Sequence, residues 1–377
     1  MKILITTGIF EPESGGPATL TPKIAARLSE AGWGVTVITY SDKAHFDFDQ
    51  KFPFKLVRVV RRGNRLLNYG TFLIAAFQHA RGARLIYSLD WLAAGLPVTI
   101  VGFLRRIPVV IRVGGDYIWE RYLETGAEPM PATDFYARNL HTSFRVMFIL
   151  IRFVLQRAHY VVFNSDVQRE MYHHDYGLDS ARTRVIYNPV PNADWHGVKR
   201  DAATREIVFA GRFVGQKNVP LLLRAFAKAR LPGDYRLLLI GDGPEKKRVE
   251  NLVDELGIRE RTTIEPGMRQ KDLYTRIRDC RAVVLPSWTD QSPNQVFEAM
   301  QLGIPMIVTA ENYLAIRDLL PVTIDPRNVD DLTRKLEMLT DESAYAEFTK
   351  KWNALSFDYD WEREMKEHRA VFEAAMR

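Results

Sequence analysis

The sequence predicts an α/β protein with two doubly wound, Rossmann-like domains, each built on a parallel sheet and facing the other across a cleft. Three observations support this prediction. The chain has 377 residues, too many for one ordinary hydrophobic core. Short apolar runs alternate with helical patterns, and continuous apolar runs are typical of strands covered on both faces. The alternation occurs in two successive series, which predicts two domains.

Thirteen apolar runs are the candidate strands. The first series contains seven runs: 2–7, 34–40, 54–60, 84–89, 107–113, 159–164 and 184–188. The second series contains six runs: 206–212, 235–243, 262–267, 281–287, 304–309 and 322–326. The polar segment 195–206 between them is the predicted linker. We therefore expect an N-terminal domain at 1–194, a C-terminal domain at 205–356 and a terminal helix at 357–377.

The composition is that of a globular protein, with 46% hydrophobic and 26% charged residues. The single cysteine, Cys280, excludes an internal disulfide and a cysteine metal cluster, which favours a reducing compartment. It opens an apolar run, so we expect it to be buried. The longest uncharged run, 91–104, is too short to span a bilayer, and the first residues do not form a signal peptide. These features predict a cytoplasmic protein.

The net charge of +6 and the isoelectric point near 9.2 suggest anionic partners. Arginines lie beside apolar segments of the N-terminal half, for example at 61–65, 105–106 and 152–157. This arrangement favours peripheral binding to a membrane surface at least as well as nucleic acid, for which no recognition motif is present. Solvated basic faces are the alternative interpretation. The candidates for acceptor or membrane contact, with core packing as the alternative, are Tyr69, Phe72, Leu73, Phe77 and Trp91.

The loop after the first predicted strand contains Gly15 and Gly16. Ligands of doubly wound sheets bind outside the carboxyl ends of the strands, so such loops are the places to search. Two glycines let the backbone approach a ligand, and the following Pro17 suits the start of a helix whose N–H groups favour anions. A helix start at 21–22, or an ordinary tight turn, remains the alternative.

The first loop of the second series, FAGRFVGQKN, carries Arg212 and Lys217. Two cations at the end of a strand suit a diphosphate, because arginine binds it bidentately and lysine supplies a point charge. As a leaving group, the diphosphate would gain charge that both cations stabilise. A solvated turn with two surface cations is the alternative.

The stretch SWTDQSPNQVFEAMQLG places Asp290 before a predicted helix and Glu298 within it. The helix start fits a capping box, with Ser292 as N-cap, Pro293 at the first position and a glutamine at the third. Acidic residues bind ribose hydroxyls in other Rossmann sites, which is the role expected for Glu298. The loop carboxylate of Asp290 is expected near the hydroxyls of a sugar. A solvated position is the alternative for Glu298.

Together these motifs resemble the retaining glycosyltransferases of family 4, which have the GT-B fold. The resemblance rests on Gly15-Gly16, Gly211-Arg212 with Lys217, the GDGP sequence at 241–244, and the Dx7E arrangement of Asp290 and Glu298 followed by AMQLGIPMIV. It covers nearly all of 205–326 and is looser in the first 190 residues. The last segment, 357–377, resembles the terminal helix that crosses back to the first domain in this fold.

The resemblance implies transfer of a sugar from a nucleotide-diphosphate sugar, with retention at the anomeric carbon. Arg212 and Lys217 would hold the diphosphate, Glu298 the ribose and Asp290 the donor sugar. The segment formed by Ser292, Pro293 and Asn294 would line the phosphates through backbone N–H groups. No metal or other cofactor is implied. The acceptor would be a glycan or a lipid-linked molecule, as in cell-surface polysaccharide or glycolipid biosynthesis on the cytosolic membrane face.

Two departures from the family pattern affect the expected site. Asp290 stands where the family usually has glutamate, and Gly114-Gly115-Asp116 stands where many members have histidine. We expect a polar role towards the acceptor for Asp116. Two alternatives to a transferase remain at this point: a nucleotide-sugar epimerase of the same fold, and a nucleotide-sugar-binding protein without catalytic activity.

Overall fold

The computed structural model describes residues 1–13, 15–190 and 204–377, and these residues form two compact units. The first unit comprises Met1–Ile118, Asn139–Asn188 and Trp361–Arg377. The second comprises Trp119–Arg138 and Pro189–Asp360. The boundary predicted at residue 194 and most of the predicted linker lie outside the described residues.

The first unit is built on a seven-stranded sheet in the order β3-β2-β1-β4-β5-β6-β7, and every pairing is parallel. Its strands are β1 (Lys2–Thr7), β2 (Gly34–Ser41), β3 (Lys55–Val60), β4 (Leu85–Ser88), β5 (Val109–Val113), β6 (Tyr160–Phe163) and β7 (Thr183–Val185). All seven strands expected from the first series of apolar runs are therefore confirmed. The strand order reverses between β1 and β4.

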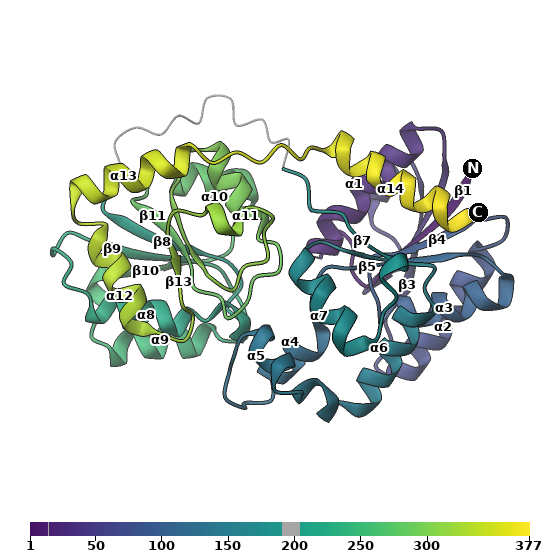
Figure 1. Cartoon of the computed structure of the whole chain (residues 1–377), viewed down its shortest axis with the longest axis horizontal. Coiled ribbons are helices and arrows are strands. Elements are labelled where there is room, and N and C mark those ends of the chain that lie inside the picture. Colours follow the sequence, from purple (N-terminus) through teal and green to yellow (C-terminus); the bar gives the residue numbers. More distant parts are fainter. Residues whose placement is uncertain (14, 191–203) are drawn as a thin grey trace. The chain divides into compact units, whose positions relative to one another are not determined.

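Helices cover both faces of this sheet (Figure 1). One face carries α1 (Gly16–Glu30) and α14 (Trp361–Met376). The other face carries α2 (Arg65–His79), α3 (Gly95–Arg105), α6 (Arg145–Arg157) and α7 (Asp166–Tyr176). Helix α1 begins directly after Gly15 and keeps Pro22 in its interior, so the alternative start at 21–22 is wrong.

The second unit is built on a six-stranded parallel sheet in the order β10-β9-β8-β11-β12-β13. Its strands are β8 (Glu206–Ala210), β9 (Arg236–Ile240), β10 (Thr262–Glu265), β11 (Ala282–Leu285), β12 (Met306–Thr309) and β13 (Thr323–Ile324). All six strands of the second series are confirmed. Cys280 is a free thiol, buried two residues before β11 begins, as expected.

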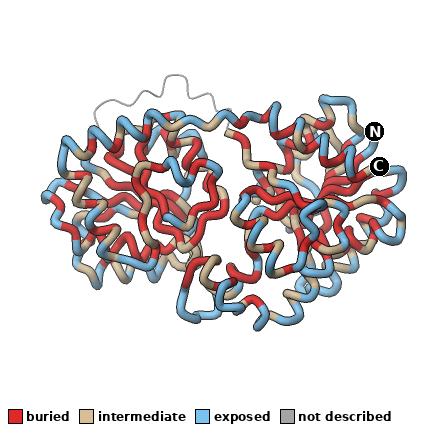
Figure 2. The backbone as a smooth tube through the Cα atoms, viewed as in Figure 1, coloured by how far each residue is buried: buried red, intermediate tan, exposed pale blue. Residues whose placement is uncertain are grey.

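The helices of the second unit also lie on two faces (Figure 1). One face carries α8 (Val219–Lys228), α9 (Lys246–Glu255) and α12 (Val329–Met338). The other carries α10 (Gln270–Ile277), α11 (Asn294–Gln301) and α13 (Glu342–Asn353). Figure 2 shows the buried strands at the centre of each unit, with exposed positions on the outer helix surfaces. This burial on both sheet faces explains why the strands have continuous apolar sequences.

The segment 119–138 comes from the N-terminal half of the sequence but packs with the second unit. It contains most of α4 (Tyr117–Leu123) and all of α5 (Ala132–Ala137). The first residue of α5 donates its N–H to Thr289 Oγ1 at 2.9 Å. The Arg327 guanidinium bridges Asp134 at 2.8 Å and Glu311 at 2.9 Å. These contacts join the segment to the loops that follow β11 and β12.

Helix α14 packs on the first sheet through a buried polar network. His368 Nδ1 lies 3.0 Å from the Glu364 carbonyl oxygen, and only an N–H at Nδ1 makes this a hydrogen bond. Its Nε2 then accepts from the Tyr87 hydroxyl at 2.8 Å and from Arg112 Nη1 at 3.1 Å. Burial, with the Arg112 charge, lowers the pKa of His368 to about 3. The imidazole is therefore neutral at physiological pH.

Glu364 lies in the same network and has the opposite pKa shift. Neither carboxylate oxygen has a hydrogen-bond partner among the described residues, although Arg112 Nη1 lies 3.9 Å from Oε1. Burial raises the pKa of Glu364 to about 7, against the opposing effect of Arg112 and Arg27. The folded state therefore binds a proton at Glu364 that the unfolded chain releases above about pH 4.3.

Substituting Glu364→Gln is expected to change how stability depends on pH. In the wild type, Glu364 makes stability fall as pH rises towards 7, because the folded state holds the extra proton. His368 makes stability fall as pH drops below about 6.5, because the unfolded state binds the proton first. The two slopes oppose each other at about pH 4.5–6.5. Of these two slopes, only that of His368 remains in the glutamine variant. Its stability should therefore rise with pH more steeply than that of the wild type, by up to about 1.4 kcal/mol per pH unit.

Urea unfolding of both proteins at several pH values within this window measures the difference. All other titrating groups are shared by the two proteins, so their contributions cancel in the comparison. Parallel stability curves would show that Glu364 has the same pKa in the folded and unfolded states.

Candidate active site

The strand order of the second unit defines where a ligand should bind. Strand β8 lies between β9 and β11, so the connections that follow β8 and β11 run in opposite directions across the sheet. Ligands of doubly wound sheets bind at such switch points, outside the carboxyl ends of the strands. The loop after β8 carries Arg212 and Lys217, and the loop after β11 carries Asp290.

The two switch-point loops are joined by hydrogen bonds. The Trp288 N–H donates to the Gln216 carbonyl at 2.9 Å, and the Gln216 side chain donates to the Thr289 carbonyl at 3.3 Å. Next to them, Lys217 Nζ lies 2.7 Å from Asp290 Oδ2. The structure thus brings together two predicted site residues that are 73 positions apart in the chain.

The backbone of Asp290 is fixed on both sides. Its N–H donates to the Glu311 carbonyl at 2.9 Å, and its carbonyl accepts from the Tyr313 N–H at 3.0 Å. The Ser287 hydroxyl also donates to Asp290 Oδ2 at 3.0 Å. The carboxylate, with a tenth of its side chain exposed, is therefore held in one position beside Lys217. An aspartate on this rigid backbone presents its charge one methylene closer to the chain than a glutamate would.

The loop with Arg212 packs tightly on the next loop of the sheet. A Cβ on Gly241 would lie 1.9 Å from the Gly211 carbonyl oxygen, so the close approach requires glycine. The Phe213 N–H donates to the Asp242 carbonyl at 3.0 Å. Arg212 itself is exposed, and its side chain has no ion pair within the described part of the chain. It is therefore a cation able to bind an anionic ligand.

Helix α11 begins differently from the sequence prediction. It starts at Asn294, with Pro293 in an extended conformation at the N-cap position and no side chain capping the helix. The predicted capping box, with Ser292 as N-cap, is therefore wrong. Pro293 lacks an N–H, so it cannot donate to a phosphate as the sequence interpretation implied. The first helical N–H groups belong to Asn294 and the residues that follow it.

Two glutamines follow Asp290 in the segment that leads into α11. The side-chain nitrogens of Gln291 and Gln295 are shielded from solvent and form no hydrogen bond with the described residues. Buried polar groups are almost always hydrogen-bonded, so such atoms at a switch point are candidates for ligand contact. Sequence reasoning missed both residues, although the quoted motif at 287–303 contains them.

The carboxylate of Glu298 is oriented by helix α10. Its Oε1 accepts from Gln270 Nε2 at 2.5 Å, and its Oε2 accepts from the Tyr274 hydroxyl. Burial and the Glu298 charge raise the pKa of Tyr274, so the phenol stays protonated as the donor. A carboxylate oxygen accepts more than one hydrogen bond. Glu298 therefore keeps acceptor capacity for the two hydroxyls of a ribose.

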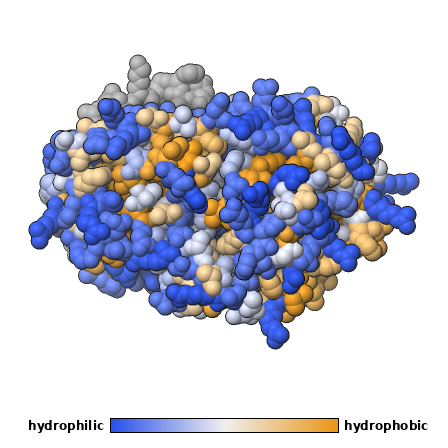
Figure 3. Space-filling view, in the orientation of Figure 1, coloured by the Kyte–Doolittle hydropathy of each residue, from blue (hydrophilic) through white to orange (hydrophobic). Residues whose placement is uncertain are grey.

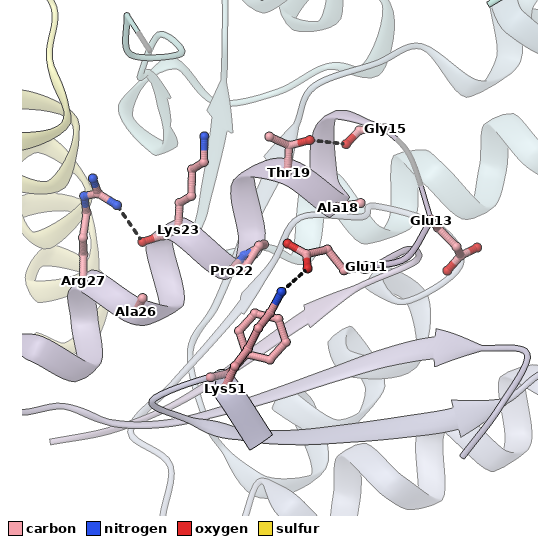
Figure 4. A pocket seen from close by; sticks show the side chains of 11 residues that line it. Glu11, Glu13, Gly15, Ala18, Thr19, Pro22, Lys23, Ala26, Arg27 and Lys51 are labelled. Atoms are coloured by element: carbon pink, nitrogen blue, oxygen red, sulfur yellow. Dashed lines mark hydrogen bonds and ion pairs between the residues drawn. The ribbon is translucent and has the colours of Figure 1, made fainter. Parts of the chain in front are cut away.

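Gly15 and Gly16 lie in the first unit, at the start of α1. Gly15 lines a pocket of about 530 Å³, shown in Figure 4, which has the size of a small-molecule site. Lys51 and Glu11, which both line the pocket, form an ion pair of 2.9 Å. A Cβ on Gly16 would meet nothing within 4 Å, so the space beside the helix start is open.

Asp116, predicted to face the acceptor, is fully buried. Its Oδ2 accepts a hydrogen bond from the Tyr172 hydroxyl at 2.9 Å. The described geometry gives this carboxylate a role in packing α7 against the end of β5, away from solvent.

Asp90 is a carboxylate that sequence reasoning missed. It follows β4, which neighbours β1 at the switch point of the first sheet. Asp90 Oδ1 accepts from the N–H groups of Leu92 at 2.9 Å and Ala94 at 2.8 Å, at the start of α3. Its Oδ2 lies where a Cβ on Gly8 would come within 2.5 Å, so it sits against the end of β1. Burial raises the pKa of Asp90 despite these N–H groups.

Tyrosines lie beside Asp90. The Tyr40 hydroxyl lies 3.1 Å from the Asn68 carbonyl oxygen and 3.3 Å from that of Ala93, which ties the start of α2 to the loop that holds Asp90. Burial, together with the Asp90 charge, raises the pKa of Tyr69, the residue after Asn68. This cluster gives the first switch point a carboxylate and neutral phenols, which suit a ligand with hydroxyl groups.

The described residues contain no group of three or more His, Cys, Asp or Glu side chains placed to hold a metal ion. Among the same residues, no helix has the length and apolar character needed to cross a bilayer.

Two family models match the chain, one on each half of the sequence. The model "Glycosyltransferase Family 4" matches residues 14–193. The model "Glycosyl transferases group 1" matches residues 197–353.

Curated relatives match over shorter segments. The "Uncharacterized glycosyltransferase YqgM" of Bacillus subtilis is 30% identical over 138 residues, which is 35% of this chain and 38% of that protein. The D-inositol 3-phosphate glycosyltransferase of Mycobacterium sp. (strain JLS) is 30% identical over 205 residues, 49% of this chain and 46% of that protein. The matched segments span less than half the length of these curated relatives.

Solved structures match over the whole length. Anabaena Alr3699/HepE in complex with UDP has a TM-score of 0.75 at 18% identity, covering 99% of this chain and all of that one. The lipopolysaccharide outer core galactosyltransferase WaaB in its apo form has a TM-score of 0.68 at 16% identity, covering 99% of both chains. This likeness shows the fold, and the two family models cover both halves of the sequence. The chain belongs to the GT-B glycosyltransferases of family 4.

Proposed function

We propose that this protein transfers a sugar from a nucleotide-diphosphate sugar to a hydroxyl group of a glycan or lipid-linked acceptor, with retention at the anomeric carbon. The observation that carries the proposal is the Lys217–Asp290 contact of 2.7 Å at the switch point of the second sheet. It combines a cation for a diphosphate with a carboxylate for sugar hydroxyls. Cell-surface polysaccharide or glycolipid synthesis is the corresponding pathway class.

In this proposal the donor is held by charge and by hydrogen bonds. Lys217 and the exposed Arg212 balance the charge of the diphosphate, so that no metal ion is needed. Glu298 accepts the ribose hydroxyls from its position between Gln270 and Tyr274. Structures of Anabaena Alr3699/HepE contain UDP or UDP-glucose. UDP-sugars are therefore the first donors to test.

The proposed chemical step makes use of this placement. The bond between the anomeric carbon and the diphosphate oxygen breaks, and a bond to the acceptor oxygen forms on the same face of the sugar. The acceptor proton passes to the departing phosphate oxygen. Negative charge grows on the diphosphate during this step, and fixed cations such as Lys217 stabilise that charge in the transition state. Asp290 keeps the lysine in place and accepts a hydrogen bond from the donor sugar.

The acceptor hydroxyl is proposed to bind at Asp90 in the first unit. Asp90 Oδ1 is occupied by backbone N–H groups at the start of α3, which leaves Oδ2 beside Gly8 for a ligand. The pocket at Gly15 belongs to the same β1–α1 loop, and the Arg61 guanidinium connects them. It donates to the Gly8 carbonyl at 3.0 Å and lies 2.8 Å from Glu13, which lines the pocket.

Substituting Asp90→Asn is expected to raise KM for the acceptor about tenfold or more, because a charge-assisted hydrogen bond is lost. The amide oxygen can still accept from the α3 N–H groups, so the fold should be preserved. Titration calorimetry with the donor nucleotide should give an unchanged Kd. A loss of donor affinity, or an unchanged KM for the acceptor, would contradict the assignment of Asp90.

Incubation with UDP-, GDP-, ADP- and dTDP-sugars and a panel of glycan and lipid-linked acceptors tests the function. Release of nucleoside diphosphate together with a glycoside of the donor's own anomeric configuration, identified by proton NMR, is the expected result. Conversion of the donor sugar without an acceptor would favour the epimerase alternative. Donor binding without turnover across the panel would favour a binding protein.

We further propose that the reaction takes place at an anionic membrane surface facing a reducing compartment, with the protein bound peripherally on the cytosolic side. The net charge of +6 and the buried free thiol of Cys280 support this proposal.

A further inference from the structure

Three helices on one face of the first sheet contain no acidic residue. They are α2 (RLLNYGTFLIAAFQH), α3 (GLPVTIVGFLR) and α6 (RVMFILIRFVLQR). Arginine is the only residue with a permanent charge in these sequences. Helix α3 packs against both α2 and α6, so the three form one continuous surface. We call this the α2–α3–α6 surface.

Exposed apolar side chains concentrate on this surface. Among the described residues, thirteen large hydrophobic side chains are exposed, and nine of them belong to these three helices. The nine are Leu66, Leu67, Ile74, Phe77, Phe103, Leu104, Val146, Ile149 and Phe153. Figure 3 shows apolar residues at the lower right, where Figure 1 places these helices. Single exposed apolar residues are ordinary, but such a concentration marks an interaction site.

A groove of about 920 Å³ opens beside α3 and α6. Ile100, Phe103, Leu104 and Phe153 supply apolar lining, while Arg106 and Arg157 add positive charge. The groove therefore offers an apolar volume bordered by cations. A phospholipid, with its acyl chains and anionic phosphate, has the complementary arrangement.

Arginine and aromatic side chains are paired on the surface. The Arg105 guanidinium lies 3.8 Å from the centre of the Phe77 ring, and that of Arg157 lies 5.7 Å from the Phe153 ring. The Nε of Arg105 is buried without a hydrogen-bond partner among the described residues. Rings beside cations are typical of elements that lie in the headgroup region of a bilayer.

The sequence interpretation of this region is refined by the structure. Phe72 and Trp91, two of its five candidates for acceptor or membrane contact, are buried, and Leu73 is half-buried. Phe77 is exposed, and Tyr69 lies in the Asp90 cluster instead. The additional contact residues belong to α3 and α6, whose relation to α2 the sequence did not reveal.

We propose that the α2–α3–α6 surface binds the face of a bilayer that contains anionic phospholipid. Phe103, Leu104, Val146 and Ile149 enter the boundary with the acyl chains, and the arginines contact phosphate groups. A second copy of the chain is the less suitable occupant, because two such surfaces would repel each other without an acidic residue to pair with.

This surface also connects the membrane to the Asp90 cluster, and that part of the inference rests on the proposed function. Asp90 holds the N-terminal end of α3, whereas Phe103 and Leu104 lie at its C-terminal end. Eleven helical residues span about 16 Å. The head of a lipid-linked acceptor would thus bind at one end of α3 while its anchor stays in the bilayer at the other.

Flotation with vesicles tests the inference, using the full chain and vesicles of phosphatidylcholine alone or with an equal part of phosphatidylglycerol. The wild type should float with the anionic vesicles and remain unbound with the neutral ones. The double substitution Phe103→Ser/Ile149→Ser should lower partitioning at least about tenfold, because two apolar side chains are removed from the boundary. Leu319→Ser is the matched control, since Leu319 is 63% exposed in the second unit and should have no effect.

A charge substitution completes the design. Arg152→Gln should weaken binding to anionic vesicles about fivefold. Lys247→Gln removes an exposed charge from the second unit and should leave binding unchanged. Equal partitioning of Phe103→Ser/Ile149→Ser and Leu319→Ser into anionic vesicles would overturn the proposal. Equal binding of the wild type to neutral and anionic vesicles would overturn it as well. Concentration-dependent dimers that Phe103→Ser/Ile149→Ser abolishes would assign the surface to a second copy instead.

The same proteins separate this inference from the proposed function. Transfer to a water-soluble acceptor should proceed equally in the wild type and in the surface variants, because the exposed side chains at 103 and 149 lie outside the Asp90 cluster and the second unit. Loss of transfer in all proteins with intact vesicle binding would contradict the proposed function alone. Intact transfer without vesicle binding in the wild type would contradict the surface alone.

Discussion

Replacing Lys217 by alanine is expected to lower kcat about a hundred- to a thousandfold, the usual effect of removing one group that stabilises transition-state charge. Lys217 lies at the switch point of the second sheet and contacts Asp290 at 2.7 Å. Its positive charge would attract the negative diphosphate as that group departs. Because the interaction strengthens in the transition state, the loss should appear mainly in kcat and less in the donor KM.

Lys228→Ala is the matched control for this substitution. Lys228 lies at the end of α8, the helix that follows the same loop, and pairs at the surface with Asp330. Exposed ion pairs contribute little to stability, so kcat should stay near the wild-type value. Thermal denaturation should show that Lys217→Ala remains folded. A Lys217→Ala protein with near-normal kcat would remove this lysine from the catalytic site.

Replacing Glu298 by glutamine is expected to raise the Kd of the donor nucleotide about ten- to a hundredfold, because charge-assisted hydrogen bonds to the ribose are lost. The substitution preserves size, and the amide oxygen can still accept from Tyr274 or Gln270. The ribose is common to the nucleotide and the intact donor. Titration calorimetry should therefore show similar weakening for UDP and for a UDP-sugar.

Glu255→Gln supplies the control, since Glu255 is an exposed acid at the end of α9 in the same unit. It should bind the nucleotide as the wild type does. A deoxyribose nucleotide tests the role of Glu298 more sharply, because it lacks one of the hydroxyls that Glu298 is proposed to bind. It should bind the wild type weakly, and the substitution Glu298→Gln should weaken its binding little further. Equal affinity of wild type and Glu298→Gln for UDP would show that another group holds the ribose.

Most strands were predictable because they are covered on both faces. Every residue of β11 is buried, so its sequence is a continuous apolar run. The order of the strands was not predictable in the same way. Strand β1 neighbours β4, and β8 neighbours β11. These adjacencies depend on long crossover connections, whose placement leaves no pattern in the local sequence.

The missed carboxylate shows the consequence of this difference. Asp116 and Asp90 are both single acids that follow a strand, and local sequence treats them alike. Burial separates them in the structure, where Asp116 is enclosed with Tyr172 and Asp90 lies partly exposed beside Gly8. The adjacency of β1 and β4 places Asp90 at the switch point, and local sequence does not reveal this adjacency.

The start of α11 illustrates a different limit. Serine, proline and glutamine at these spacings satisfy the rule for a capping box, yet Pro293 has an extended conformation and the helix begins one residue later. The loop before it is held by tertiary hydrogen bonds, from Asp290 to Glu311 and Tyr313. Such contacts outweigh a local preference of about 1 kcal/mol for a capping serine. The predictions for Asp290 and Glu298 do not depend on the exact helix start, because they rest on residue type.

The path of the chain through the two units limits how the protein can be divided. The backbone passes from one unit to the other after Ile118, Arg138, Asn188 and Asp360. Dividing the chain into two fragments at any single position therefore separates at least one unit from part of its own sequence. A fragment beginning in the segment 191–203 would lack α5. It would therefore lose the hydrogen bond from the first N–H of α5 to Thr289 and the ion pair between Asp134 and Arg327. Exchange of one half of the sequence for another during evolution would therefore have to carry the segment 119–138 together with the second unit.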